Sequence, residues 1–156
     1  MKVLFVCLGN ICRSPLAEGI FMDLVKKADL QGFIEVDSAG TAAYHVGEFP
    51  DPRTRQVAEK NGIILTHRAR QFVKSDFDEF DYILAADKSN LNHLKMLQST
   101  PSKAKLHLIR DWEGKNLEVP DPYYGTMKDF EEGFQILRKA LILFLEDLRK
   151  EMASET

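Results

Sequence analysis

Four short segments of this chain have the apolar pattern of β-strands. Lys2 to Cys7 is an almost continuous apolar run, which is typical of a strand buried on both faces of a sheet. Three further strands are predicted at Phe33 to Ser38, Asp81 to Ala86 and Lys105 to Ile109. Gly40 is expected to break the second of them, because glycine weakens a strand interior.

Helical spacing separates the predicted strands. Ser14 is interpreted as the N-cap of a first helix. A second helix is expected to begin at Asp51-Pro52 and to end at Asn61-Gly62. Ser75 suggests a short capped turn, and the leucines of residues 91–97 have helical spacing.

The last helix is the clearest element in the sequence. Apolar residues recur at steps of three and four from Met127 to Leu148, and Thr126 is in position to cap the helix. Residues 110–125 form a long loop before it, and residues 151–156 are expected to be a flexible tail after it. Strands that alternate with helices predict βαβ units, a parallel sheet and a single α/β domain over the whole chain.

Composition narrows the possible partners. The chain has 156 residues, of which 44% are hydrophobic and 29% charged, and its net charge of -3 argues against a nucleic-acid binder. No stretch approaches the roughly 18 apolar residues of a membrane span, and the start is too short for a signal peptide, so we expect a cytoplasmic protein. The two cysteines are too few for a disulfide scaffold.

A loop between the first strand and the first helix carries the candidate chemistry. It consists of Cys7, Leu8, Gly9, Asn10, Ile11, Cys12, Arg13 and Ser14. The loop has neither the Gly-Lys-Ser/Thr ending nor the glycine triplet of nucleotide-binding loops. Successive backbone N–H groups of a tight loop can converge on one anion, and the following helix adds its positive end. We therefore expect a phosphate-binding loop beyond the carboxyl end of the first strand.

Each residue type in this loop suits that purpose. Gly9 is expected to relieve unusual backbone angles, and Asn10 to tolerate a left-handed conformation and tie the loop together. Arg13 offers a planar fork to two phosphate oxygens. Ser14 is placed to donate its hydroxyl to the sulfur of Cys7, a role that competes with helix capping. Taken alone, Cys7 is equally a buried apolar residue, but its position before the arginine and the serine favours a nucleophile.

The motif Cys-x5-Arg-Ser near the start of the chain resembles the low-molecular-weight protein tyrosine phosphatases. The segment Asp121-Pro122-Tyr123-Tyr124-Gly125 resembles the general-acid loop of that family, and Asp37-Ser38-Ala39-Gly40 is also similar. The resemblance spans nearly the whole chain. It implies a single Rossmann-like (flavodoxin-like) three-layer domain, in which helices flank a four-stranded parallel sheet.

The resemblance also implies a reaction. Cys7 is the expected nucleophile, Arg13 the transition-state stabiliser and Asp121 the general acid and base, in the hydrolysis of phosphotyrosine and aryl phosphates through a phosphocysteine. An aspartate before a proline is otherwise a common start of a turn. No cofactor or catalytic metal is expected, because His45, His67 and the remaining histidines lack metal-ligand spacing.

Other residues are assigned supporting roles by the resemblance. Tyr44, Tyr123 and Tyr124 are expected to form the pocket walls, although ordinary surface packing explains any single tyrosine. Cys12 is expected to form a reversible disulfide with Cys7, although a small packing residue is the alternative. The residues expected to support the loop from behind are Asn10, Ser14, Ser38, His67 and Asp87.

Two other functions compete with the phosphatase. An arsenate reductase of the same fold generally needs further cysteines, and this chain has none beyond Cys12. A non-catalytic phosphotyrosine- or anion-binding module does not need the nucleophile, the arginine and the acid together. The expected partners are phosphotyrosine-containing proteins or small aryl phosphates, without nucleic acid or membrane, and the expected state is a monomer capable of weak self-association.

Overall fold

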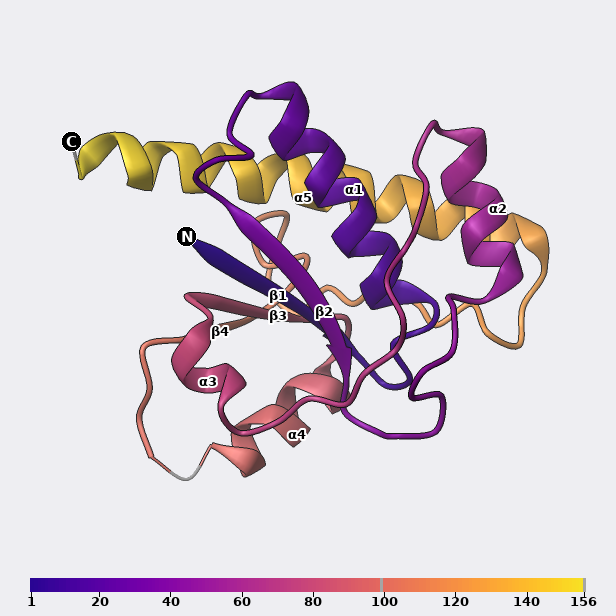
Figure 1. The fold of residues 1–156 in the computed structure, drawn as a ribbon, viewed down its shortest axis with the longest axis horizontal. Coiled ribbons are helices and arrows are strands. Elements are labelled where there is room, and N and C mark those ends of the chain that lie inside the picture. The colour runs from indigo at the N-terminus through magenta and orange to yellow at the C-terminus, as the bar shows by residue number, and fades with distance from the viewer. Residues whose placement is uncertain (99, 156) are drawn as a thin grey trace.

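The computed structural model describes residues 1–98 and 100–155 and has a parallel sheet between two layers of helices (Figure 1). The strands are β1 (Lys2–Cys7), β2 (Glu35–Gly40), β3 (Tyr82–Ala85) and β4 (Lys105–Leu108). The helices are α1 (Arg13–Lys27), α2 (Pro52–Lys60), α3 (Asp76–Glu79), α4 (Lys88–Leu97) and α5 (Met127–Ser154). The order β2-β1-β3-β4, with every neighbouring pair parallel, confirms the predicted α/β fold.

Burial on both faces explains why β1 reads as a continuous apolar run. Val3 and Phe5 are fully buried in the cluster beneath α1, α2 and α5. Leu4 and Val6 point the other way, into a second buried cluster shared with α3 and α4. Side chains alternate across a strand, so a central strand of a three-layer fold needs apolar residues at every position.

The long helix α5 crosses the layer formed with α1 and α2 (Figure 1). The ring of Phe144 lies 5.2 Å from that of Phe21, 5.3 Å from that of Tyr82 and 4.5 Å from that of Trp112. The helix continues to Ser154, so the tail expected from residue 151 is helical over its first four residues. The hydroxyl of Tyr82 in β3 donates a hydrogen bond of 2.6 Å to the Glu151 carboxylate, which ties this end of α5 to the sheet.

Several predicted boundaries need correction. The N-cap position of α1 is Cys12, which places Ser14 inside the first turn. Strand β2 begins at Glu35 and includes Gly40, which does not break it. A Cβ atom on Gly40 would lie 2.7 Å from the carbonyl oxygen of Leu8, so this glycine allows β2 to approach the loop after β1.

The caps of the middle helices differ in how well they were predicted. Asp51 caps α2 as expected, since its side chain accepts the N–H of Arg53. Ser75 occupies the N-cap position of α3 but makes no side-chain capping bond. Among the described residues, no helix is long and apolar enough to cross a membrane.

We expect Phe144→Ala to lower the free energy of unfolding by about 3–5 kcal/mol, because the truncation leaves a cavity among three aromatic rings. Chemical denaturation followed by far-ultraviolet circular dichroism measures the change. Glu146→Ala, at an exposed position of the same helix, is the control and should change stability by less than about 0.5 kcal/mol. Equal effects of the two substitutions would show that this ring cluster does not carry the packing of α5.

Candidate active site

The loop from Cys7 to Arg13 lies where the sheet changes its winding direction. The chain passes from β1 to β2 on one side and then crosses back to β3 on the other side of β1, which opens a crevice at the carboxyl ends of the strands. Backbone hydrogen bonds fix the loop there, from Thr41 N–H to the Cys7 carbonyl (2.9 Å) and from Ala42 N–H to the Leu8 carbonyl (3.0 Å).

The sulfur of Cys7 faces the first turn of α1. Its Sγ atom lies 3.0 Å from the Oγ of Ser14 and accepts the backbone N–H of Ser14 at 3.4 Å. An N–H group of a helix N-terminus carries partial positive charge and favours an anion beside it. Placing Ser14 within the helix, rather than at its cap, therefore brings both its N–H and its hydroxyl to the sulfur.

Asn10 holds the loop from inside. Its backbone is left-handed, with φ of 57°, as the sequence predicted. Its amide nitrogen donates to the hydroxyls of Ser14 (2.7 Å) and Ser38 (3.0 Å). Its amide oxygen accepts from His67 Nε2 (2.8 Å) and from the backbone N–H of Arg70 (3.0 Å). The hydrogen-bonding capacity of this buried amide is thus filled, which fixes both the amide and the loop.

Gly9 has a different role from the expected one. The left-handed residue of the loop is Asn10, whereas Gly9 has no such φ value. A Cβ atom at Gly9 would lie 2.9 Å from the ring of His45, so the glycine leaves room for that histidine. His45 borders the loop and was assigned no site role from the sequence.

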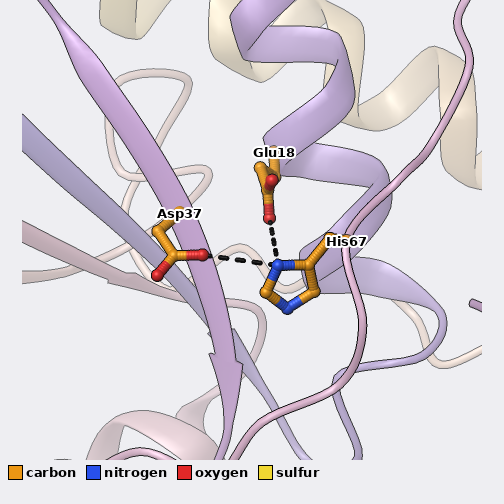
Figure 2. A group of neighbouring side chains, drawn as sticks. All are labelled: Glu18, Asp37 and His67. Carbon is orange, nitrogen blue, oxygen red and sulfur yellow. Dashed lines mark ion pairs between the residues drawn. The ribbon is translucent and has the colours of Figure 1, made fainter. Parts of the chain in front are cut away.

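Behind Asn10, three ionisable side chains meet (Figure 2). His67 Nδ1 lies 3.3 Å from a carboxylate oxygen of Glu18 and 3.4 Å from one of Asp37. Ser38 donates its hydroxyl to the same Glu18 oxygen at 2.6 Å. Burial, together with the negative charge of Asp37, raises the pKa of Glu18 to about 7. Burial also lowers the pKa of His67.

Arg13, the first residue of α1, reaches across the crevice to Asp87, which caps α4 just after β3. Its side chain is only 5% exposed, and Nη1 donates to Asp87 (2.7 Å) and to the Val119 carbonyl (2.9 Å). Burial acts to lower the pKa of Arg13, but the negative charges of Cys7 and Asp87 outweigh it and raise the pKa overall. The guanidinium is therefore a fixed cation beside the sulfur. Asp87 thus binds a residue of the loop directly.

The loop opens into a cavity of about 230 Å³. Its lining is made by Cys7, Leu8, Gly9, Ile11, Cys12, Arg13, Tyr44, His45, Asp121, Tyr123 and Tyr124. The structure thus brings the three predicted tyrosines to the same cavity as the sulfur. The rings of Tyr123 and Tyr124 pack edge to face, 4.9 Å apart. Aromatic walls of this kind suit a planar aryl group.

Asp121 reaches the cavity from the long loop before α5. Its carboxylate is 45% exposed and lies 3.7 Å from Arg13 Nη2. The other carboxylate oxygen accepts the backbone N–H of Tyr123 at 3.1 Å, a turn contact of the kind that an Asp-Pro sequence favours. The turn and the position beside the cavity therefore coexist.

An arginine that the sequence did not single out connects this loop to α2. Arg53 donates from Nη2 to the Tyr123 carbonyl (2.9 Å) and from Nη1 to the Gly125 carbonyl (3.2 Å). Its guanidinium also lies over the ring of Phe130, 4.4 Å from the centroid.

Asp51 fixes that arginine and touches the phosphate loop. Its carboxylate accepts from the side chain of Arg53 at 3.0 Å and 3.1 Å. Its backbone N–H donates to the Ile11 carbonyl at 2.8 Å. Asp51 and Arg53 together thus join the loop of Cys7 to the loop of Asp121. No local signal revealed the arginine, because its partners are about 70 residues away in the sequence.

The two cysteines of the loop are free and have different surroundings. Burial raises the pKa of Cys12 to about 12, with further contributions from the charges of Asp51 and Cys7. Cys12 is therefore a protonated thiol at neutral pH. It lines the same cavity as Cys7.

A Cys-x5-Arg loop at the carboxyl end of the first strand, beside an aspartate on a facing loop, has the architecture of a phosphatase on a flavodoxin-like sheet. The family model for "Low molecular weight phosphotyrosine protein phosphatase" matches residues 2–154, and the chain belongs to this family. The family predicted from the motifs is thereby confirmed, and so is the assignment to the protein-tyrosine-phosphatase class of enzymes.

Relatives of this kind cover most of the chain. The low molecular weight phosphotyrosine protein phosphatase of Saccharomyces cerevisiae is 46% identical over 140 residues, which are 86% of this chain and 87% of the relative. The Homo sapiens protein of the same name is 46% identical over 148 residues, covering 93% and 94%. A crystal structure of a protein tyrosine phosphatase from Entamoeba histolytica superposes with a TM-score of 0.92, at 40% identity over 97% of this chain and 99% of that one.

The surroundings of Cys12 lead to a reactivity prediction. In the Cys7→Ser protein, iodoacetamide at neutral pH should leave Cys12 unmodified, because a pKa of about 12 keeps the thiol protonated and burial shields it. Intact-protein mass spectrometry detects the adduct. The pKa of Cys12 is raised, so its thiolate forms only as the pH approaches about 12. The same protein in denaturant is the control and should be alkylated; equally fast alkylation of the folded protein would contradict the prediction.

Proposed function

We propose that this chain hydrolyses phosphotyrosine and other aryl phosphate monoesters through a covalent phosphocysteine at Cys7. One observation carries the proposal: the Cys7 sulfur, the Arg13 guanidinium and the Asp121 carboxylate line a single cavity with aromatic walls. A nucleophile, a cation for the phosphoryl oxygens and an acid are the groups that this reaction requires. The chemistry calls for no metal, because the loop donors and Arg13 offset the phosphoryl charge.

In the first step, the Cys7 thiolate attacks phosphorus and the bond from phosphorus to the aryl oxygen breaks. Asp121, in its protonated form, gives its proton to the departing oxygen. Arg13 Nη1 is anchored by Asp87 and Val119, so the opposite edge of the guanidinium is left for the phosphoryl oxygens. The product of this step is a phosphocysteine and a free phenol.

In the second step, water attacks the phosphocysteine and Asp121 takes up a proton from it. The bond from phosphorus to sulfur breaks, and inorganic phosphate leaves. Ser14 assists, because its hydroxyl lies 3.0 Å from the sulfur and its N–H also points there, so the departing thiolate meets two donors. Loop residues 8–12 contribute backbone N–H groups to the phosphate oxygens throughout.

The cavity supports an aryl substrate. Tyr44, Tyr123 and Tyr124 border the mouth and offer faces to a phenyl ring. The Entamoeba histolytica structure carries Hepes in its active site, and Hepes ends in a sulfonate, which is a tetrahedral oxyanion like phosphate. Phosphotyrosine-containing proteins are accordingly the proposed partners.

Oxidation of Cys7 is a further part of the proposal. A peroxide converts the Cys7 thiolate to a sulfenic acid, and the thiol of Cys12 then attacks that sulfur, forming a disulfide and releasing water. The high pKa of Cys12 slows this second step, because the thiolate is the attacking species. The disulfide should therefore form faster as the pH rises and the thiolate fraction of Cys12 grows.

The central test is phosphate release from p-nitrophenyl phosphate in the presence of EDTA. We expect activity in the parent chain and a loss on the order of 10⁴-fold or more in Cys7→Ser. An arsenate-dependent thiol oxidation without phosphate release would favour a reductase, and phosphate binding without release would favour a binding module. Activity that EDTA removes and that survives Cys7→Ser would overturn the proposal.

The general acid is tested by the leaving group. Asp121→Asn should lower kcat/KM on the order of 10²- to 10⁴-fold for phenyl phosphate, a poor leaving group, and far less for p-nitrophenyl phosphate. A plot of log kcat/KM, which reports the first step alone, against the phenol pKa measures this as a steeper slope. Asp111→Asn, a change in the same long loop but outside the cavity, is the matched control. An unchanged slope in Asp121→Asn would assign the proton to another group.

Arg53 is proposed as a positioning residue for Asp121, since it holds two carbonyls of the acid's loop. Arg53→Gln should lower kcat/KM for phenyl phosphate on the order of tenfold to a hundredfold, with a smaller change for p-nitrophenyl phosphate. Arg55→Gln, at an exposed position of the same helix, should leave the slope of the leaving-group plot unchanged. Should Arg53→Gln slow both substrates equally, the arginine would serve stability alone.

A further inference from the structure

Three side chains from separate parts of the fold converge behind the phosphate loop. Glu18 extends from α1, Asp37 from β2, and His67 from the segment before β3 (Figure 2). One ligand atom from each lies within 4.8 Å of the other two. The three residues do not line the cavity that holds Cys7. We propose that Glu18, Asp37 and His67 form a binding site for a divalent transition-metal ion, for which Zn²⁺ is the best match.

The orientation of the imidazole prepares His67 as a ligand. Its Nε2 lies 2.8 Å from the amide oxygen of Asn10, which also accepts the N–H of Arg70. The amide nitrogen of Asn10 donates to two hydroxyls, which fixes the orientation of the amide. Nε2 therefore carries a hydrogen, and Nδ1 is the ring nitrogen that faces the two carboxylates. Metal-binding histidines usually donate their second ring nitrogen to an oxygen in this way.

The separations fit a shared ion better than a direct proton contact. Zn²⁺ binds nitrogen and oxygen at about 2.0–2.1 Å, so neighbouring ligands of a tetrahedral site lie about 3.3–3.4 Å apart. His67 Nδ1 lies 3.3 Å from Glu18 and 3.4 Å from Asp37. Charge-assisted hydrogen bonds are shorter, at about 2.7–2.9 Å. The two distances thus match two edges of such a tetrahedron and exceed the length of strong hydrogen bonds.

The surrounding groups hold the carboxylates without blocking them. Ser38 donates its hydroxyl to the Glu18 oxygen that faces the imidazole and its N–H to the facing oxygen of Asp37. Each carboxylate oxygen has a second lone pair for a metal. Arg70 binds the remote oxygen of Asp37 and leaves the near one to the site. Imidazole with two carboxylates is a donor set that suits Zn²⁺.

The ion has a route from solvent. The side chains of Glu18 and His67 are each 13% exposed, and that of Asp37 is 36% exposed. Water takes the fourth coordination position on the side of Asp37. Through His67 and Asn10, the site is connected to the hydroxyl of Ser14 and thus to the sulfur of Cys7. A metal ion here acts on the geometry of the phosphate loop and does not touch phosphate.

The test uses the Cys7→Ser, Cys12→Ser protein, in which no thiol competes for Zn²⁺. Isothermal titration should show one Zn²⁺ per chain, and nitrogen-15 NMR should show a shift of Nδ1 in His67 while its Nε2–H is retained. His45, His93 and His107 serve as internal controls. Because both readouts report binding and neither requires activity, the result does not depend on the proposed phosphatase mechanism.

Variants assign the ligands. Glu18→Gln and Asp37→Asn should each weaken Zn²⁺ affinity about tenfold or more, whereas Glu48→Gln, beside His45, should have no effect. Zn²⁺ should raise Tm in the thiol-free parent and raise it less in Glu18→Gln. Asp37 is the most exposed of the three residues, so Asp37→Asn is the substitution that should disturb folding least. It tests the metal site if Glu18→Gln fails to fold. Absence of saturable binding, or binding that leaves His67 Nδ1 unmoved, would overturn the inference.

Discussion

The amide of Asn10 is the contact on which the rest of the site depends. It fixes a left-handed residue in the middle of the loop, and its four hydrogen bonds reach α1, β2 and the segment before β3. A buried amide with every group satisfied has one favourable orientation, because each lost partner costs about 1–3 kcal/mol. The Asn10 side chain therefore sets the position of the Ser14 hydroxyl beside the Cys7 sulfur. Asn10 itself does not meet the substrate.

The sheet supplies the second constraint. Arg13 lies after β1 and Asp87 lies after β3. The two strands are neighbours because β2 pairs with one edge of β1 and β3 pairs with the other. A buried guanidinium is costly unless its N–H groups are bound, and Asp87 with the Val119 carbonyl meets that need. One edge of the guanidinium is thus satisfied by the protein before substrate arrives. The arginine is positioned by topology as much as by its place in the loop motif.

Whether the sequence predicted a feature depends on how far apart in the chain its contacting residues lie. The residues from Cys7 to Ser14 are adjacent in the sequence, so their types predict an anion-binding site that follows a buried strand. Glu18 and Arg53 are ordinary polar residues of amphipathic helices, and their roles come from partners brought close by the fold. Gly9 was assigned to backbone strain, but the space needed by His45 explains it, which no local pattern contains.

The two thiols of the loop show how one short segment creates opposite environments. Cys7 lies at the end of a strand, where a helix N-terminus and Arg13 direct positive charge at its sulfur. Cys12 occupies the N-cap position of that helix but is buried near the Asp51 carboxylate, and its pKa rises to about 12. Asp51 in turn holds Arg53 and the loop of Asp121. Burial, with a further contribution from the Asp51 carboxylate, thus keeps the second thiol protonated, and the same carboxylate helps to hold the loop of Asp121 through Arg53.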